Sequence, residues 1–392
     1  MDLFTKCENY SVAKDAQASG LYPYFIPLEE SEGPLAKFNG KTLIMCGSNN
    51  YLGLTTHPEV QEAVHAAVSR FGSSCTGSRF LNGTLQLHEQ LENELAEWLE
   101  KDRALVFSTG MQVNLGTISS LVGRKDYVIL DKEDHASIVD GARLSYGDLI
   151  RYKHNDMDDL AGKLSRLSPD RGKLLVVDGL YSMEGDISPL PEIIPLCKKY
   201  GVRLMVDDAH AVGVLGKGKG TAAHFGLTEE VDLIMGTFSK SFASIGGYIA
   251  GDETVIDYVK HNARSLIFSA SIPGPNAAAA LAALHVMQRE PERIERVNQI
   301  GATMRAELTR LGFDIGFSET PVIPIIIGDD THTLQSWKLL FENGVFVNPV
   351  LSPAVPPGRQ LLRTSYMATH TDEQIAQVLS IFEDVGKQLG LI

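Results

Sequence analysis

The chain is poor in cysteine and in long apolar runs. Four cysteines occur among 392 residues, at positions 7, 46, 75 and 197, without a C-x-x-C pair, which argues against a disulfide framework or a thiolate zinc site. The longest apolar stretch, 277–284, is too short to span a bilayer. The first ten residues lack the basic start and apolar run of a signal peptide. We therefore expect a cytoplasmic protein without an integral membrane segment.

Positive charge is also scarce. The sequence has 35 Lys and Arg against 49 Asp and Glu, a formal charge of −14. Broad binding to nucleic acid needs a surplus of basic side chains, so nucleic acid is not an expected partner, although a local basic site is still allowed. With 44% hydrophobic residues, the chain has the composition of an ordinary globular protein. At roughly 100–200 residues per domain, its length of 392 residues predicts two or three domains.

What is present is an alternation of short buried runs and helical stretches. The runs ALVFS, YVILD, LLVVDG, RLMVDD, DLIMGTF and GYIAG all fall between residues 51 and 275. Such alternation predicts an α/β domain with a mostly parallel central sheet and helices on both faces. We expect residues 1–50 to form an N-terminal arm, with a short helix near 8–19 and a hairpin at Asn39-Gly40. Residues 276–392 are expected to form a smaller α+β domain.

Two charged residues follow two of these runs. Asp207 ends RLMVD and Lys240 lies just after DLIMGTF. Ligands of open α/β sheets bind outside the carboxyl ends of the strands, so both side chains are expected at one crevice. A lysine can form a Schiff base with the aldehyde of pyridoxal phosphate, and a carboxylate can keep its pyridine nitrogen protonated. On this pair alone, a buried Asp–Lys ion pair is an equally good interpretation.

Other polar residues at the same edge of the sheet favour the cofactor site. A helix N-terminus and hydroxyl groups bind phosphate readily. Histidines that follow other strands are further candidates for contact with the cofactor. The residues are Ser108, Thr109 and Gly110 in FSTGMQ, Thr237, Ser239 and Ser241 in GTFSKS, and His135 and His210 in EDHAS and DDAH.

These motifs carry a resemblance. DDAHAVGVLG and GTFSKSFASIGGYIAG, with SNNYLGL, GSRFLNGT, FSTGMQVN and DKEDHASIVDGARLS, resemble the α-oxoamine synthase family of fold-type I pyridoxal-phosphate enzymes from about residue 21 to the C-terminus. Within that family, GLYPYF, YSMEGD, ARSLIFSASIP and VFVNPVLSPAVP are most similar to the bacterial members that condense L-serine with palmitoyl-CoA. The resemblance implies the fold-type I architecture and pyridoxal 5'-phosphate as cofactor.

The resemblance also implies roles for individual residues. Lys240 is the Schiff-base lysine and general base, Asp207 the partner of the pyridine nitrogen, His210 the partner of the phenolic oxygen, and His135 the residue stacked on the ring. On the phosphate side it implies Gly110, Met111, Thr237 and Ser239, with Ser182 as a further cofactor contact. Met111 departs from the family pattern, in which an aromatic residue is common. Arg363 is implied to grip the substrate carboxylate, with Asn50 beside it and His135 assisting.

The implied reaction is the decarboxylative condensation of L-serine with palmitoyl-CoA, a long-chain acyl-CoA, giving 3-oxosphinganine, CoA and CO2. Sister activities remain open, because 8-amino-7-oxononanoate synthase, glycine C-acetyltransferase and 5-aminolevulinate synthase share the cofactor residues. The apolar stretches LYPYFIP and VLSPAVPP could line an acyl channel or simply pack between domains.

Two other functional classes fit less well. The stretch GKGKG at 216–220 suggests a nucleotide-binding module, but it is not a G-x-x-x-x-G-K-[ST] motif and does not form a first strand–helix turn. A pyridoxal-phosphate-binding regulator would need a DNA-reading domain; we expect none before the fold, and the net charge of −14 also opposes one. The resemblance further implies a homodimer in which Ser269 reaches the partner's cofactor phosphate. The lipid-like product is compatible with peripheral contact with a membrane, although no basic amphipathic helix is evident.

Overall fold

The centre of the computed structural model, which describes residues 2–392, is a seven-stranded sheet in the order β4-β10-β9-β8-β7-β5-β6. Neighbouring strands from β9 to β6 are parallel, and β10 alone runs antiparallel to both of its neighbours. This confirms the predicted α/β class with a mostly parallel sheet. The strands are β4 (Arg103–Phe107), β5 (Tyr127–Asp131), β6 (Asp148–Tyr152), β7 (Lys173–Asp178), β8 (Arg203–Asp207), β9 (Leu233–Thr237) and β10 (Gly247–Gly251).

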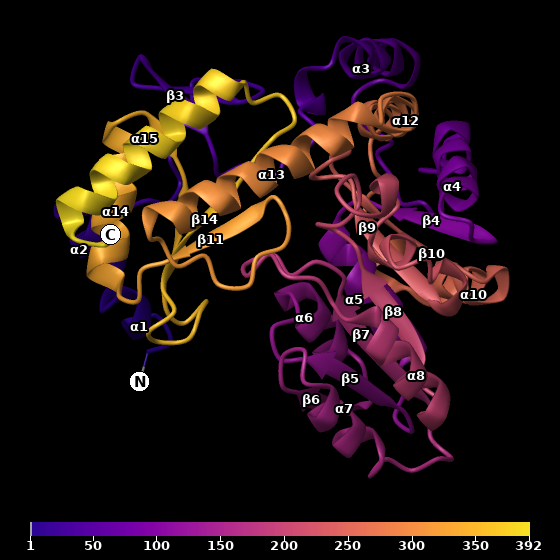
Figure 1. Cartoon of the computed structure of the whole chain (residues 1–392). Coiled ribbons are helices and arrows are strands. Elements are labelled where there is room, and N and C mark those ends of the chain that lie inside the picture. Colours follow the sequence, from indigo (N-terminus) through magenta and orange to yellow (C-terminus); the bar gives the residue numbers. More distant parts are fainter. Residues whose placement is uncertain (1) are drawn as a thin grey trace.

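Helices cover both faces of this sheet (Figure 1). Successive residues of β7 show why: Val176 packs in the core cluster that contains residues of α5 and α6, whereas Val177 packs in the cluster with residues of α7 and α8. Because strand side chains alternate between faces, a strand covered on both sides reads as an unbroken apolar run. The helices are α5 (Gly110–Leu121), α6 (Ala136–Leu144), α7 (Met157–Leu164), α8 (Leu190–Tyr200), α9 (Thr221–His224), α10 (Glu253–Asn262) and α11 (Arg264–Ile267).

One strand of the large sheet was not expected from the sequence. Strand β6 pairs with β5 at the edge of the sheet, and its sequence, DLIRY, buries only Tyr152 completely. Four of its five residues are exposed or partly exposed, so it shows no uninterrupted apolar run, whereas β4, at the other edge of the sheet, is mostly buried. The six apolar runs found in the sequence correspond to the other six strands.

The N-terminal segment joins the C-terminal lobe rather than standing apart. Helices α1 (Thr5–Glu8) and α2 (Val12–Ala18) replace the single helix expected at 8–19. The hairpin of β2 (Leu35–Phe38) and β3 (Lys41–Met45) is as predicted, with positive φ at Asn39 and Gly40. Strand β1 (Glu30–Glu32) extends this sheet on one side, and β12 (Val345–Phe346) pairs with β3 in parallel on the other.

The smaller lobe contains a second sheet, in the order β11-β14-β13, and three long helices (Figure 1). Its elements are α13 (Glu292–Leu311), β11 (Val322–Ile326), α14 (Asp330–Glu342), β13 (Asn348–Val350), β14 (Leu361–Ser365) and α15 (Asp372–Leu389). The core here is a separate cluster that includes Trp337, Tyr366 and Phe382. The lobe corresponds to the predicted α+β part, and the three-part division at residues 50 and 275 stays a prediction.

Three further helices pack together on the large lobe: α3 (Pro58–Phe71), α4 (Gln86–Trp98) and α12 (Gly274–Arg289). The expected long helical stretch after residue 277 divides into α12 and α13 at Pro291, since proline removes a backbone donor. The buried alanines of α12 belong to the same core cluster as Leu91 and Tyr248. Helix α12 is therefore part of the large-lobe core.

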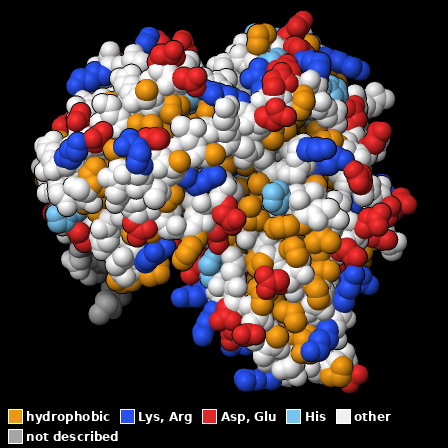
Figure 2. Space-filling view, in the orientation of Figure 1, with side chains coloured by type: hydrophobic (Ala, Val, Ile, Leu, Met, Phe, Trp, Pro, Cys, Tyr) orange, Lys and Arg blue, Asp and Glu red, His pale blue; other side chains and the backbone are white. Residues whose placement is uncertain are grey.

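The surface carries charge of both signs. Figure 2 shows acidic and basic side chains intermixed over the face it displays, without an extended area of one sign. Among the described residues, no helix has both the length and the apolarity that a bilayer crossing requires. All four cysteines are free thiols.

Candidate active site

The side chains that follow the central strands meet in one cavity of about 340 Å³. Asp207 is the last residue of β8, and Lys240 lies three residues after the end of β9. The two were predicted to converge because parallel strands end at one edge of the sheet. Of the other predicted cofactor residues, those that also line the cavity are Gly110, Met111, His135, Ser182, His210, Thr237 and Ser239.

Asp207 is held in place by two donors. Its Oδ2 accepts a 2.7 Å hydrogen bond from Asn114 Nδ2, and its Oδ1 accepts a 3.0 Å bond from the backbone N–H of Ala209. Asp207 is 3% exposed, so these bonds replace much of the water that a carboxylate would otherwise bind. Asn114 also donates to Ser137 Oγ at 2.8 Å, which connects the carboxylate to the first turn of α6.

Lys240 loses its proton more readily than an ordinary lysine. Burial lowers the pKa of Lys240 to about 8; Arg363 also lowers it, while Asp207 and Asp178 oppose the shift. Desolvation disfavours the charged form of a lysine, and a nearby positive charge acts in the same direction. A Schiff base forms only from an unprotonated amine, so this environment prepares Lys240 for the predicted reaction.

His210 lines the same cavity as Lys240. It is 9% exposed, and burial lowers the pKa of His210 well below its usual range, assisted by the positive charges of Lys240 and Arg363. Its Nδ1 lies 2.7 Å from the hydroxyl of Tyr51. The imidazole is therefore neutral, with one nitrogen turned to Tyr51 and the other left for a ligand.

His135 caps the N-terminus of α6. Its Nδ1 accepts from the backbone N–H of Ser137 at 3.2 Å, and its own backbone N–H donates to Asp178 Oδ2 at 2.9 Å. Burial lowers the pKa of His135, and the charge of Lys240 adds to this while Asp207 opposes it. The cap fixes the ring at the rim of the cavity, where it lines the wall.

The opposite end of the cavity is suited to an anion. Helix α5 begins at Gly110, and Thr109 caps it by accepting from the N–H of Gln112. The first N–H groups of a helix have no partner inside it and favour negative charge. Thr237 Oγ1 lies 2.9 Å from Ser239 Oγ, and a Cβ on Gly110 would come within 2.9 Å of Thr237 Oγ1. A side chain at position 110 would therefore crowd the hydroxyl of Thr237.

The residues present fit pyridoxal phosphate. A carboxylate and a neutral histidine lie near the lysine, and hydroxyl groups with a helix N-terminus supply an anion-binding end. Pyridoxal phosphate presents a ring nitrogen, a phenolic oxygen, an aldehyde and a phosphate, and each of these meets a residue of matching chemistry in this set. The individual roles assigned to the residues stay predictions.

Arg363 approaches from the small lobe. It lies in β14 and is 5% exposed, with Nε donating to Ser182 O at 2.5 Å and Nη2 donating to Asn49 Oδ1 at 3.0 Å. The guanidinium has five N–H donors in all and can hydrogen-bond a carboxylate in addition to these partners. Because Ser182 lines the cavity, this places the guanidinium beside it.

Asn50, which the resemblance places beside Arg363, forms its side-chain hydrogen bonds within its own loop, and its role at the substrate stays a prediction. Its Nδ2 donates to Thr55 Oγ1 at 2.9 Å, and its Oδ1 accepts from the N–H of Leu54. The side chain therefore stabilises the turn after SNN, and the neighbouring Asn49 contacts Arg363 instead. A shift of one residue in this loop turns the side chain in another direction, which a motif alone does not show.

Ser269 lies near the anion-binding end but does not line the cavity. Its Oγ accepts a 2.8 Å hydrogen bond from Gln112 Nε2 in the first turn of α5. The reach of Ser269 to a second subunit stays a prediction.

Three site residues were missed by the sequence reasoning. Asp178 ends β7 and lines the cavity, and the rule that selected Asp207 would also have found it in LLVVDG. Asn114 is a polar residue on an otherwise buried helix face, a weaker signal. Tyr51 gives no signal in the sequence, because it contacts His210 only in the tertiary fold.

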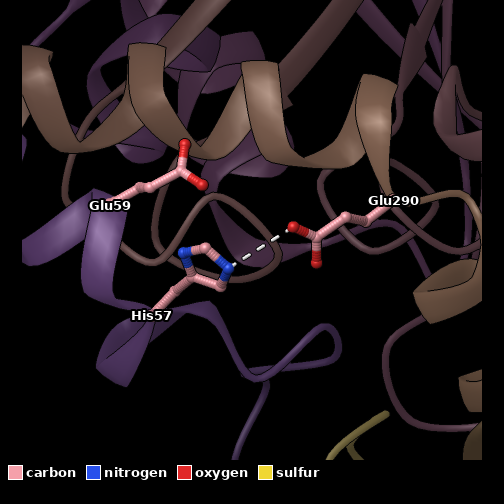
Figure 3. A group of neighbouring side chains, drawn as sticks. All are labelled: His57, Glu59 and Glu290. Carbon is pink, nitrogen blue, oxygen red and sulfur yellow. Dashed lines mark ion pairs between the residues drawn. The ribbon is translucent and has the colours of Figure 1, made fainter.

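A second group of ionisable side chains lies away from this cavity. His57 Nε2 is 3.6 Å from Glu290 Oε1, and Glu59 lies on the other side of the ring (Figure 3). Arg289 Nη2 is bonded to Glu59 at 2.6 Å and to Glu290 at 3.2 Å. A guanidinium thus already compensates both carboxylates, so we interpret the group as an ion-pair network between α3 and the end of α12.

Comparison with known proteins agrees with the geometry. Residues 41–382 match the model of the family "Aminotransferase class I and II". Serine palmitoyltransferase of Sphingobacterium spiritivorum is 50% identical over 98% of this chain and 97% of its own. 8-Amino-7-oxononanoate synthase of Symbiobacterium thermophilum is 43% identical over 95% of this chain and 96% of its own. Serine palmitoyltransferase of S. paucimobilis with a bound PLP–myriocin aldimine has a similar structure, with a TM-score of 0.97, 36% identity and 100% of each chain covered.

Proposed function

Because the chain belongs to the class I and II aminotransferases and, within them, to the α-oxoamine synthase family, we propose that it is a pyridoxal-phosphate-dependent serine palmitoyltransferase. The reaction joins L-serine and palmitoyl-CoA to give 3-oxosphinganine, CoA and CO2. The convergence of Lys240, Asp207 and His210 on one cavity supports the cofactor chemistry, which the sister enzymes share. The observation that carries the choice of activity is the greater identity to serine palmitoyltransferase, 50%, than to 8-amino-7-oxononanoate synthase, 43%.

Pyridoxal phosphate, when bound, supplies an aldehyde that bonds covalently to amines and a ring that withdraws electrons from a bond being broken. Lys240 Nζ would hold this aldehyde. Asp207 would keep a proton on the ring nitrogen, and His210 would hydrogen-bond the phenolic oxygen. Gly110, Met111, Thr237 and Ser239 would bind the phosphate, with Ser182 as an additional contact, by the donors described above.

Lys240 also moves the proton of the reaction. As an unprotonated amine, Lys240 Nζ would accept the proton from the serine Cα and would later return one to the product. Its pKa of about 8, set chiefly by burial, suits both tasks, because a general base works best with a pKa near the working pH. Asp207 and Arg363 act on that pKa in opposite directions.

Arg363 and His135 would orient the serine carboxylate. Arg363 is bonded to the carbonyl of Ser182, a residue of the cavity wall, and His135 and Lys240 line the same cavity. Holding the carboxylate on that side presents the Cα–H bond to Lys240 Nζ. Such positioning can lower the activation barrier by several kcal/mol, on the order of 7–11 kcal/mol in favourable cases.

The acyl donor and the assembly are further parts of the proposal. We infer that a long-chain acyl-CoA is the second substrate and that the enzyme acts as a cytoplasmic homodimer, in which Ser269 contacts the partner's cofactor. The exposed apolar residues near the cavity, Met111, Ile245 and Phe268, support a covering by acyl chain or by a second subunit. Peripheral membrane contact would suit a lipid-like product.

Steady-state assays across amino acids and acyl-CoA lengths test the proposal. We expect turnover with L-serine and palmitoyl-CoA, and little with L-alanine and pimeloyl-CoA or with glycine and acetyl-CoA. Preference for either of the latter pairs would assign the chain to a sister activity of the same family. Lys240→Ala, with a wild-type circular dichroism spectrum, provides the inactive control.

A further inference from the structure

We infer that Tyr51 fixes the tautomer of His210, so that the Nε2 proton of His210 faces the cofactor's phenolic oxygen. Tyr51 is thus a positioning residue that acts through His210 and touches neither substrate nor cofactor itself. The effect on the cofactor rests on the proposed function, whereas the tautomer of His210 can be observed in the protein without cofactor.

The contact is short and fully enclosed. Tyr51 follows β3 in the SNNYLGL loop, is 0% exposed, and places its Oη 2.7 Å from Nδ1 of His210. Its ring stands edge-on to the imidazole, with the centroids 6.2 Å apart. Because Tyr51 is fully buried, the protein groups around this hydroxyl decide which partners it has.

Those groups assign the phenolic proton. Within residues 2–392, Tyr51 Oη has one other acceptor in reach, Asn49 Oδ1 at 3.4 Å. That bond is long, and the same oxygen already accepts from Arg363 at 3.0 Å. Arg363 can only donate, and it also acts on Tyr51: burial raises the pKa of Tyr51, while the charge and hydrogen bonding of Arg363 lower it in part. Tyr51 is therefore a neutral phenol whose oxygen meets a cation and whose proton points to His210 Nδ1.

The protonation state of His210 decides which of its ring nitrogens carries the proton. A neutral imidazole has one N–H and one acceptor nitrogen. The charged or titratable groups that face His210 are Lys240 after β9, Arg363 in β14 and His135 before α6, with Asp207 lining the same cavity. The three basic groups oppose protonation of the ring. If Nδ1 accepts from Tyr51, the single proton lies on Nε2, and His210 donates to the phenolic oxygen rather than accepting from it.

Donation has a chemical consequence for the bound cofactor. A hydrogen bond to the phenolic oxygen stabilises its negative charge, which is greatest when the neighbouring nitrogen of the lysine linkage has lost its proton. The donor thereby lowers the pH at which the cofactor attached to Lys240 titrates. Without Tyr51, both tautomers of His210 are accessible and the donor is present only part of the time.

The first test observes the tautomer directly. Tyr51→Phe removes one oxygen atom and keeps the ring, and histidine side-chain 15N NMR of the cofactor-free protein distinguishes a protonated from an unprotonated ring nitrogen, with His210→Gln identifying the signal. We expect unprotonated Nδ1 and protonated Nε2 in the wild type and averaged signals in Tyr51→Phe. A wild-type His210 protonated at Nδ1 would overturn the inference.

The second test uses the loaded enzyme. The visible absorbance of the bound cofactor is followed against pH, and we expect the midpoint in Tyr51→Phe to rise by about one pH unit, as for one weakened hydrogen bond to a charged oxygen. Tyr366→Phe is the matched control, because Tyr366 is also 0% exposed and its hydroxyl has no hydrogen-bond partner. An unchanged midpoint in Tyr51→Phe contradicts the inference.

The two tests separate the inference from the proposed function. If the protein bound no pyridoxal phosphate, the absorbance band would be missing and the proposed function would fail, yet the NMR result would still decide the tautomer. If the band forms and the tautomer is the opposite one, only the role of Tyr51 is lost.

Discussion

Asn114 Nδ2 donates a 2.7 Å hydrogen bond to Asp207 Oδ2, which joins the middle of α5 to the carboxyl end of β8. The same amide donates to Ser137 at the start of α6. One buried side chain thus positions the carboxylate assigned to the ring nitrogen and the helix that carries His135. The site depends on this residue even though it was not predicted from the sequence.

Replacing Asn114 should therefore weaken cofactor binding. We predict that Asn114→Ala lowers cofactor affinity and kcat each by about tenfold or more, the effect of losing a hydrogen bond to a charged group. Thr117→Val is the control, since Thr117 lies one turn further along α5, is buried and has an unpartnered hydroxyl. Equal cofactor dissociation constants for the two variants, measured by fluorescence titration, would show that Asn114 does not position Asp207.

The pKa of about 8 for Lys240 predicts how cofactor attachment depends on pH. Only the unprotonated amine attacks the aldehyde, so the rate in cofactor-free protein should rise about tenfold per unit below pH 8 and level off above it. Stopped-flow absorbance measures this rate directly. A midpoint near 10.5, the pKa of an ordinary lysine, would contradict the burial of Lys240.

Two variants check the causes of that shift. Asp207 raises and Arg363 lowers the pKa of Lys240, so Asp207→Asn should move the midpoint to lower pH and Arg363→Met should move it to higher pH. Movement of both midpoints in the same direction would show that charge at these two positions does not govern the lysine.

A buried ion pair in the GSRFLNGT segment predicts a large effect on stability. Arg79 and Glu92 are 9% and 8% exposed and form two hydrogen bonds, of 2.8 and 3.0 Å. Removing one partner leaves the other buried without a counter-charge, so Arg79→Ala should lower the free energy of unfolding by about 3–5 kcal/mol in urea titrations. The exposed pair Lys387–Glu383 is the control, and Lys387→Ala should cost less than about 1 kcal/mol.

Ala243 predicts an effect of the opposite sign. Its φ is +52°, and its N–H donates to Lys240 O at 3.0 Å in the turn that carries the lysine. A left-handed conformation costs an alanine roughly 1–2 kcal/mol, more than the extra entropy that glycine loses on folding. Ala243→Gly should therefore raise the unfolding free energy by about 0.5–1 kcal/mol.

The comparison for that variant is an alanine in ordinary helical conformation. Ala282→Gly in α12 should lower the unfolding free energy by about 1 kcal/mol. Destabilisation by both substitutions would mean that the turn at Ala243 is not strained.

Much of the site could be predicted because it depends on strand ends. Asp207 and Lys240 follow apolar runs, and parallel strands bring their carboxyl ends together whatever the length of chain between them. The same reasoning selected His135 and His210, and the resemblance then added their individual roles and Arg363. What could not be predicted depends on side-chain direction: Asn49 rather than Asn50 contacts Arg363, and a motif does not show which of two neighbouring amides turns inward.

Contacts between distant segments were likewise hidden. Tyr51 and His210 are separated by 159 positions and meet at a single atom pair, which no periodicity or composition reports. Strand β6 was missed because four of its five residues are partly or fully exposed at the sheet edge. The fold class survives such omissions because it follows from the buried strands, whereas the hydrogen-bond network does not.

Substrate preference tests the central claim most directly. Purified enzyme with bound cofactor is assayed for CoA release with L-serine, L-alanine and glycine, each combined with palmitoyl-CoA, pimeloyl-CoA and acetyl-CoA, and Lys240→Ala serves as the blank. The account predicts the highest kcat/KM for L-serine with palmitoyl-CoA and no turnover by Lys240→Ala. A higher kcat/KM for L-alanine with pimeloyl-CoA, or CoA release by Lys240→Ala, would contradict it.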